Sequence, residues 1–150
     1  MGNSVKLTIQ LTDDQMADYP VSAEALWFDK EGDLYRLQNI PMFIDNLSFN
    51  DLVDVRPISD VLFEIIEVVS KSENSTVWLY FSDMNDAARN FIKGLEKFGC
   101  VIEGGVLPGY YAVNVPGDVN FATVHLLILA AEDDDLLSPH YPSIRHLAPQ

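Results

Sequence analysis

The sequence predicts an α+β protein: an N-terminal small antiparallel β-sheet or five-stranded barrel, followed by a βαββα plait-like unit. Short apolar, β-branched stretches separated by turns fill the first half of the chain. The second half mixes strand-like stretches with two helical ones. A polar stretch at 71–75 separates the two, which predicts subdomains 4–70 and 75–150 within one compact unit. At 150 residues, with 48% of them hydrophobic, the chain can bury a core without disulfide bonds or metals.

The first half contains five predicted strands. Apolar and polar residues alternate from Val5 to Thr12, the pattern of a strand with one face in solvent. Gly32 lies in a polar turn between two apolar stretches, which predicts a hairpin. A helix competes for residues 61–69, but their β-branched side chains favour a strand. We place these strands at residues 5–12, 23–28, 34–38, 51–58 and 61–69.

Two connections in this half are irregular. Residues 13–20 form an acidic loop. Residues 39–50 contain Pro41, which cannot donate to the interior of a sheet, yet they are too apolar for open solvent. We therefore expect 39–50 to be a buried connecting loop.

The second half is organised around a helix between strands. Ser82 and Asp83 offer an N-cap, and Gly99 is suited to end the helix. One face of that helix is apolar and is expected to pack on the sheet: Ala88, Phe91, Ile92, Leu95 and Phe98. Of the strands around it, one is predicted at residues 76–81, a second begins at residues 101–102, and a third is predicted at 110–115.

A second helix is predicted from Asn120 to Ala131. It is apolar nearly all round, so it must be buried on two sides or be covered by a partner. Residues 136–150 contain prolines and are expected to be an ordered tail that frays toward its end. Whether this tail contains a last strand is not decided by the sequence.

The charge is the outlying property of the composition. Twenty-three Asp and Glu residues against nine Lys and Arg give a net charge of −14. Such a field repels nucleic acid and anionic lipid and attracts a basic protein, although simple solubility is an equally good explanation. There is no apolar signal segment and no run of 18 apolar residues, so we expect a cytoplasmic protein without a membrane span.

Six blocks of sequence resemble a bacterial family catalogued as domain of unknown function 4265: YPVSAEALWF, LYRLQNIPMF, LSFNDLVDV, SENSTVWLYF, LEKFGCVIEGG and VNVPGDVNF. The resemblance runs from about Val5 to the second helix, and it implies a small soluble bacterial protein. It supplies no catalytic residues. This chain has Asn74 where related sequences tend to have a glycine-histidine pair before Ser-Thr, so any role of that histidine is absent here.

No catalytic, cofactor or metal site is predicted. His125 lies in an apolar helical stretch, and His140 and His146 lack the spacing of a zinc pair. Cys100 has apolar neighbours and no histidine near it in sequence, which favours a buried inert thiol. Nucleophile-elbow, dinucleotide-binding and phosphate-loop motifs are also missing from the sequence.

Acidic runs are the candidate partner-binding residues. One follows the second helix, where negative charge opposes the helix dipole, and the other lies in the predicted hairpin: Glu132, Asp133, Asp134 and Asp135, and Asp29, Glu31 and Asp33. The function expected is therefore a protein-binding inhibitor, a cytoplasmic immunity protein or antitoxin that neutralises a basic bacterial toxin such as a nuclease. A non-catalytic regulatory or scaffold domain, and an enzyme with an unrecognised site, are the alternatives. The oligomeric state is left open.

Overall fold

The chain forms two compact units, Met1–Ser72 and Glu73–Gln150. The computed structural model describes residues 3–14 and 21–146. Much of the predicted acidic loop 13–20 and the end of the predicted tail thus lie outside the described residues. The described part is mixed α+β, with nine strands in two sheets and two long helices, α2 and α3.

The first unit is a curled five-stranded sheet. Neighbouring strands are antiparallel in the order β1-β2-β3-β4-β5, and β1 meets β5 at one parallel pair, Ile9 and Phe63. The sheet therefore closes at one point and has no continuous ladder at its seam, so the predicted small sheet is right and a true barrel is not formed. Its strands are β1 (Ser4–Gln10), β2 (Ala23–Glu31), β3 (Leu34–Leu37), β4 (Leu52–Pro57) and β5 (Phe63–Ser70).

Strand β5 and the hairpin turn follow the prediction. Residues Phe63–Ser70 are a strand and not the competing helix. Gly32 joins β2 to β3 with a positive φ of 64°, a conformation that glycine adopts without the steric cost of a side chain.

The loop between β3 and β4 is buried, as predicted. Its side chains Ile40, Met42, Phe43, Ile44 and Leu47 are at most 8% exposed. Buried backbone without a regular ladder needs other hydrogen-bond partners, and two carboxylates supply them.

Glu24 and Asp51 are those carboxylates. Glu24 on β2 accepts hydrogen bonds from the backbone N–H groups of Met42 and Phe43, at 2.7 and 3.0 Å. Asp51, which is fully buried, accepts from the N–H groups of Ser48 and Ser72, both at 2.9 Å. The two acids therefore fix the loop to the sheet from both ends.

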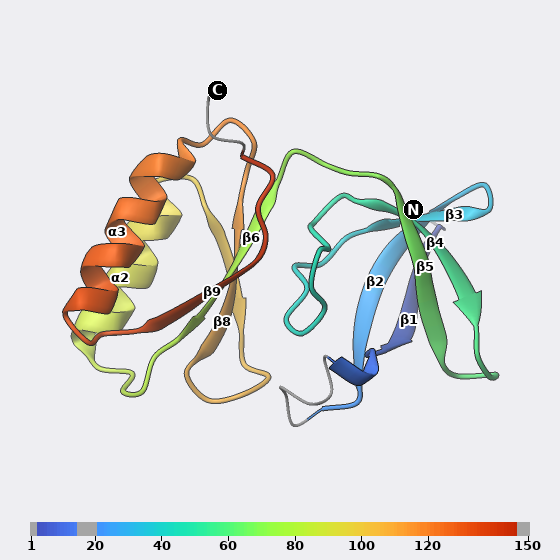
Figure 1. Ribbon diagram of the computed structural model, residues 1–150, viewed down its shortest axis with the longest axis horizontal. Helices are drawn as coiled ribbons and strands as arrows, with labels where there is room; N and C mark the ends of the chain where they lie inside the picture. The colour runs from blue at the N-terminus through green and yellow to red at the C-terminus, as the bar shows by residue number, and fades with distance from the viewer. Residues whose placement is uncertain (1–2, 15–20, 147–150) are drawn as a thin grey trace. The chain divides into compact units, whose positions relative to one another are not determined.

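The second unit is a four-stranded antiparallel sheet in the order β7-β8-β6-β9. Helices α2 and α3 cover one face of this sheet (Figure 1). The first five elements follow the predicted order strand, helix, strand, strand, helix, and β9 adds a strand within the predicted tail. The bounds are β6 (Ser75–Tyr80), α2 (Asp86–Lys97), β7 (Val101–Gly104), β8 (Tyr110–Val115), α3 (Phe121–Asp133) and β9 (Ser138–Ser143).

The start of α2 differs from the prediction. The N-cap is Asn85, whose side chain accepts a hydrogen bond from the N–H of Ala88 at 2.9 Å. Ser82 and Asp83 lie in a bend before the helix, so the predicted cap is wrong. Several residues that favour the N-cap position precede the apolar face, and composition does not distinguish among them. The end is as predicted, with Gly99 at φ 112°.

The apolar face of α2 is only partly buried. Leu95 is 1% exposed and lies in a core with Val77, Leu79 and Val113. Phe98 is 41% exposed, which contradicts its predicted burial. Phe98 is the C-cap residue and keeps helical φ and ψ, so the helical period still sets the direction of its side chain but does not ensure that other elements cover the ring at the helix end.

We expect Leu95→Ala to lower the free energy of unfolding by about 2–5 kcal/mol, because it leaves a cavity in a closed core. Phe98→Ala, the matched control, should cost less than about half as much because the ring is already partly in solvent. Urea unfolding of both variants followed by circular dichroism measures the difference. Equal losses would contradict the helix packing described above.

Asp51→Ala is expected to destabilise the protein by about 2–4 kcal/mol, since it leaves two backbone N–H groups without their acceptor. Asp60→Ala, at an exposed position of the same unit, should change stability by less than about 0.5 kcal/mol. Thermal melts at fixed pH compare the two. A harmless Asp51→Ala substitution would show that the carboxylate does not hold the loop.

Candidate functional site

Helix α3 packs on the sheet with one narrow side. It starts at Asn120, whose side chain accepts a hydrogen bond from the N–H of Thr123 at 3.1 Å. Val124, Ile128 and Ala131 follow at spacings of four and three residues and are buried. This spacing is one side of a helix, so the remaining apolar residues must point elsewhere.

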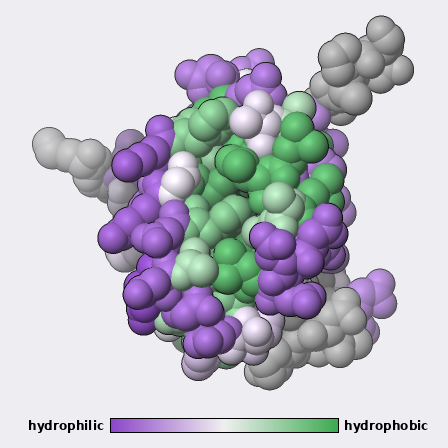
Figure 2. All heavy atoms as spheres, turned by 90° about the vertical axis from the view of Figure 1, so that its left-hand side faces the viewer, coloured by the Kyte–Doolittle hydropathy of each residue, from purple (hydrophilic) through white to green (hydrophobic). Residues whose placement is uncertain are grey.

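The outer side of α3 is apolar and exposed. Leu126, Leu127 and Leu129 are 67%, 42% and 39% exposed, and we call these three residues the leucine face. Figure 2 shows apolar side chains gathered on the helical face of this unit, with hydrophilic ones around them. The prediction that α3 is buried on two sides is thus wrong. The alternative prediction from the sequence, that a partner covers the apolar helix, remains. An exposed apolar patch with a polar border is typical of an interaction surface.

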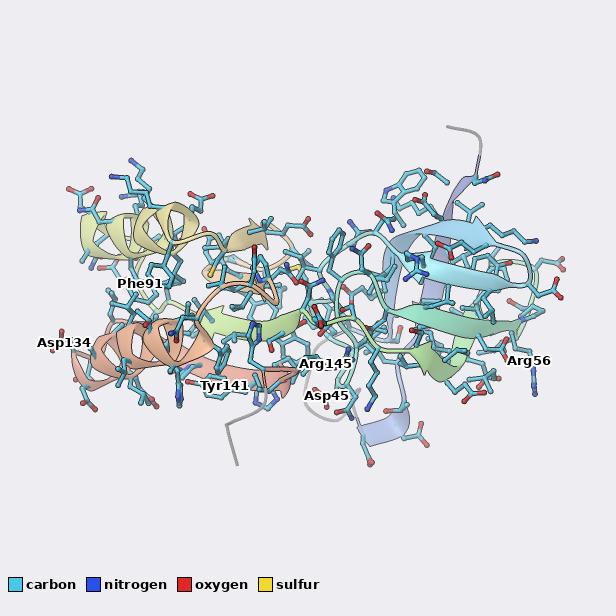
Figure 3. All side chains as sticks on the ribbon, turned by 90° about the horizontal axis from the view of Figure 1, so that it is seen from above. Asp45, Arg56, Phe91, Asp134, Tyr141 and Arg145 are labelled. Atoms are coloured by element: carbon cyan, nitrogen blue, oxygen red, sulfur yellow. The ribbon has the colours of Figure 1, made fainter. Side chains whose placement is uncertain are left out.

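The acidic run adjoins the leucine face. Helix α3 continues two residues past the predicted end, so Glu132 and Asp133 lie in its last turn and Asp134 is the C-cap. Asp133 is four residues after Leu129 and therefore lies on the same side of the helix. Figure 3 shows Asp134 at the C-terminal end of α3. All four acids of the run are exposed.

The end of α3 has a definite backbone cap. Asp135 has a positive φ of 57°, and the N–H of Leu136 donates to the carbonyl oxygen of Ala131 at 2.9 Å. This cap fixes where the acidic run turns away from the helix. Burial, together with the Glu132 carboxylate, raises the pKa of Tyr141 on β9.

The predicted hairpin acids are partly paired. Glu31 accepts hydrogen bonds from the Arg36 guanidinium, one of them from Nη2 to Oε1 at 3.0 Å, and this pairing holds the pKa of Glu31 below its usual value. Asp29 accepts from the hydroxyl of Ser4 at 3.0 Å. Asp33 is exposed in the turn. The charge of Glu31 is therefore already engaged, which makes the run at α3 the stronger candidate.

The histidines lie in aromatic contacts of the second unit. His125 stacks on Phe121, with ring centroids 5.9 Å apart, and meets Tyr141 edge-on at 5.3 Å. His140 stacks on Trp78 at 5.4 Å. Within the described residues, no group of three His, Cys, Asp or Glu side chains is placed to hold a metal ion.

Ser75 and His146 form a pair that no spacing in the sequence could reveal. The Ser75 Oγ lies 2.6 Å from His146 Nδ1, and His146 Nε2 lies 2.8 Å from the carbonyl oxygen of Pro116. Because that carbonyl can only accept, Nε2 carries the proton and Nδ1 accepts from the serine hydroxyl. The Ser75 Oγ also accepts the N–H groups of Arg145 and His146, at 2.7 and 3.2 Å.

This pair has the atoms of a nucleophile and its base, but its setting is structural. Ser75 is fully buried and its oxygen is surrounded by backbone donors, so a substrate carbonyl cannot approach it. What the pair does is attach the segment after β9 to the start of β6.

Cys100 is buried, at 5% exposure, in the core of the second unit. Burial raises the pKa of its thiol to about 11. The thiolate, which is the nucleophilic form, is therefore scarce at neutral pH.

Together, these features define a mixed α+β protein with an exposed apolar helix face that ends in an acidic run. A family model, described as domain of unknown function (DUF4265), matches residues 24–138. The chain belongs to this family. Comparison with curated proteins finds no match.

One solved structure confirms the fold. It is described as a novel crystal structure of a hypothetical protein from Neisseria gonorrhoeae, and it is 21% identical to this chain. The match covers 93% of this chain and 94% of that one, with a TM-score of 0.76. In the described part of this chain, no helix has the length and apolar character needed to cross a membrane.

We expect Cys100 to react with iodoacetamide at pH 7.4 at least about 100-fold more slowly in the folded protein than in urea, because burial suppresses both thiolate and access. Mass spectrometry of timed samples measures alkylation. Rapid alkylation of the folded protein would contradict the inert role assigned to this thiol.

Proposed function

We propose that this protein binds a basic protein partner through the leucine face of α3 and the acidic run 132–135. The observation that carries the proposal is the continuity of the two features along one side of one helix, from Leu126 to Asp133. The leucines supply apolar area to be buried, and the carboxylates supply charge at the border. A dry apolar centre with a charged rim is the usual composition of a specific protein interface.

The net charge of −14 favours a basic partner over other macromolecules. Nucleic acid and anionic lipid carry charge of the same sign, so long-range attraction is absent for both. A basic protein would be steered toward this surface, and the leucine face would then hold it.

An inhibitor is the function that best uses such a surface. A toxin that acts on nucleic acid has a basic cleft, and an acidic protein can cover that cleft by imitating the charge of the substrate. We therefore propose a cytoplasmic immunity protein or antitoxin, acting without catalysis. A regulatory or scaffold domain would use the same surface on a partner whose activity it does not block.

The triple variant Asp133→Asn, Asp134→Asn and Asp135→Asn tests the surface. With a candidate basic toxin as the binding partner, we expect the association rate at low salt to fall about tenfold and its salt dependence to flatten. The dissociation rate should change less, because rim charges steer more than they hold. Stopped-flow or surface-based kinetics at two salt concentrations give both rates.

Two further variants separate the alternatives. Leu126→Ser should raise the dissociation rate about tenfold or more while leaving the salt dependence intact, because it removes apolar area from the centre. Asp29→Asn with Asp33→Asn is the matched control on the hairpin and should bind as the unaltered protein does. A response of the control but not of the triple variant would move the interface to the hairpin. Binding without loss of toxin activity would favour the scaffold alternative.

A further inference from the structure

A pocket of about 570 Å³ lies in the first unit beside the seam between β1 and β5. It is lined by residues 9–14, by 44–47 of the buried loop, by Ile58 and by β5. The pocket exists because β1 and β5 pair only at Ile9 and Phe63, so the ladder that would close the wall is not formed. Its volume is in the range of small-ligand sites in proteins.

The pocket is lined by both apolar and polar side chains. Among the apolar ones, Ile58 is 46% exposed and Ile65 and Val68 are partly exposed, so these three present the accessible apolar surface. The N–H of Leu11 donates to the carbonyl oxygen of Ser22 at 3.0 Å, which holds the end of this wall. Aliphatic groups of a ligand can therefore rest on a preformed surface.

The rim of the pocket is acidic on two sides. Asp13 and Asp14 follow β1, whereas Glu64 and Glu67 come from β5, and all four are exposed. None of the described residues that line the pocket is a lysine, an arginine or a histidine. Negative charge thus faces the opening from separate elements.

A cross-strand pair adds to this charge. Glu67 lies directly opposite Asp54 on β4, and like charges at such positions destabilise a sheet. Glu64, by contrast, lies opposite Arg56. A positively charged ligand near Glu67 would relieve the unfavourable pair, so Glu67 is the acid on which binding should depend most.

We propose that this pocket binds an aliphatic polycation, in which ammonium groups are separated by methylene chains. The methylenes would lie on the apolar wall and the ammonium groups would meet carboxylates on the two sides of the rim. A bare divalent ion fits less well, since no three acids in the described part are close enough to chelate one. Both a free polyamine and a lysine-rich peptide segment have this chemistry.

The experiment is a titration of full-length protein with isoleucine methyl groups labelled for NMR. Spermidine and a tetralysine peptide are added in separate series, with MgCl₂ at equal ionic strength as the control. Binding in the pocket should shift the methyl signals of the isoleucines that line it, Ile9, Ile44, Ile58 and Ile65. The methyl signals of Ile92, Ile102 and Ile128 in the other unit should not shift. Shifts with only one ligand would identify the free amine or the peptide as the source.

The variant Asp14→Asn with Glu67→Gln should raise the Kd for the active ligand about fivefold, because two exposed charge pairs are lost. Asp29→Asn with Asp33→Asn, outside the pocket, should leave the Kd unchanged, and thermal melts show that both variants are folded. No methyl shifts with either amine, equal shifts with MgCl₂, or equal weakening by the control variant would overturn the proposal. Because this assay needs no toxin and reads only the first unit, its result is separate from that of the proposed interface on α3.

Discussion

Hydrogen bonding of buried, irregular backbone is the constraint on which the first unit depends. Residues 39–50 carry too much apolar surface to lie in solvent and too little regularity to pair in the sheet. Their burial is possible because the carboxylates of Glu24 and Asp51 accept hydrogen bonds from backbone N–H groups of this loop and of Ser72. The position of this loop then decides where Ile44 and Leu47 lie, and with them one wall of the pocket.

In the second unit the same kind of constraint is met by Ser75 and His146. One buried hydroxyl accepts two backbone N–H groups and donates to an imidazole, whose other nitrogen donates to Pro116. The serine-histidine contact attaches the chain after β9 to the start of β6. The geometry of a pair is therefore informative about function only together with its burial and with the partners that already occupy its atoms.

The acidic residues of this chain do different work according to what borders them. Glu24 and Asp51 accept hydrogen bonds from the backbone, and Glu31 pairs with Arg36. The run 132–135 lies beside the leucine face, and Glu67 lies at the rim of the pocket. A total charge of −14 cannot distinguish these roles. The apolar neighbours of each acid distinguish these roles. Charge next to exposed apolar surface gives a site both electrostatic attraction and apolar area that a partner can bury.

The sequence by itself determined the elements whose signals are local. The strand Tyr110–Val115, the turn at Gly32 and the helix end at Gly99 follow from composition, period and positive φ. The tertiary structure decided which capping residue starts α2, how far Phe98 is exposed, and that α3 packs by one side only. It also decided the contact between Ser75 and His146, which are 71 residues apart, and the pocket beside β1 and β5, which pair at one position. These features depend on contacts between distant segments, and periodicity records only the preference of each segment for its own conformation.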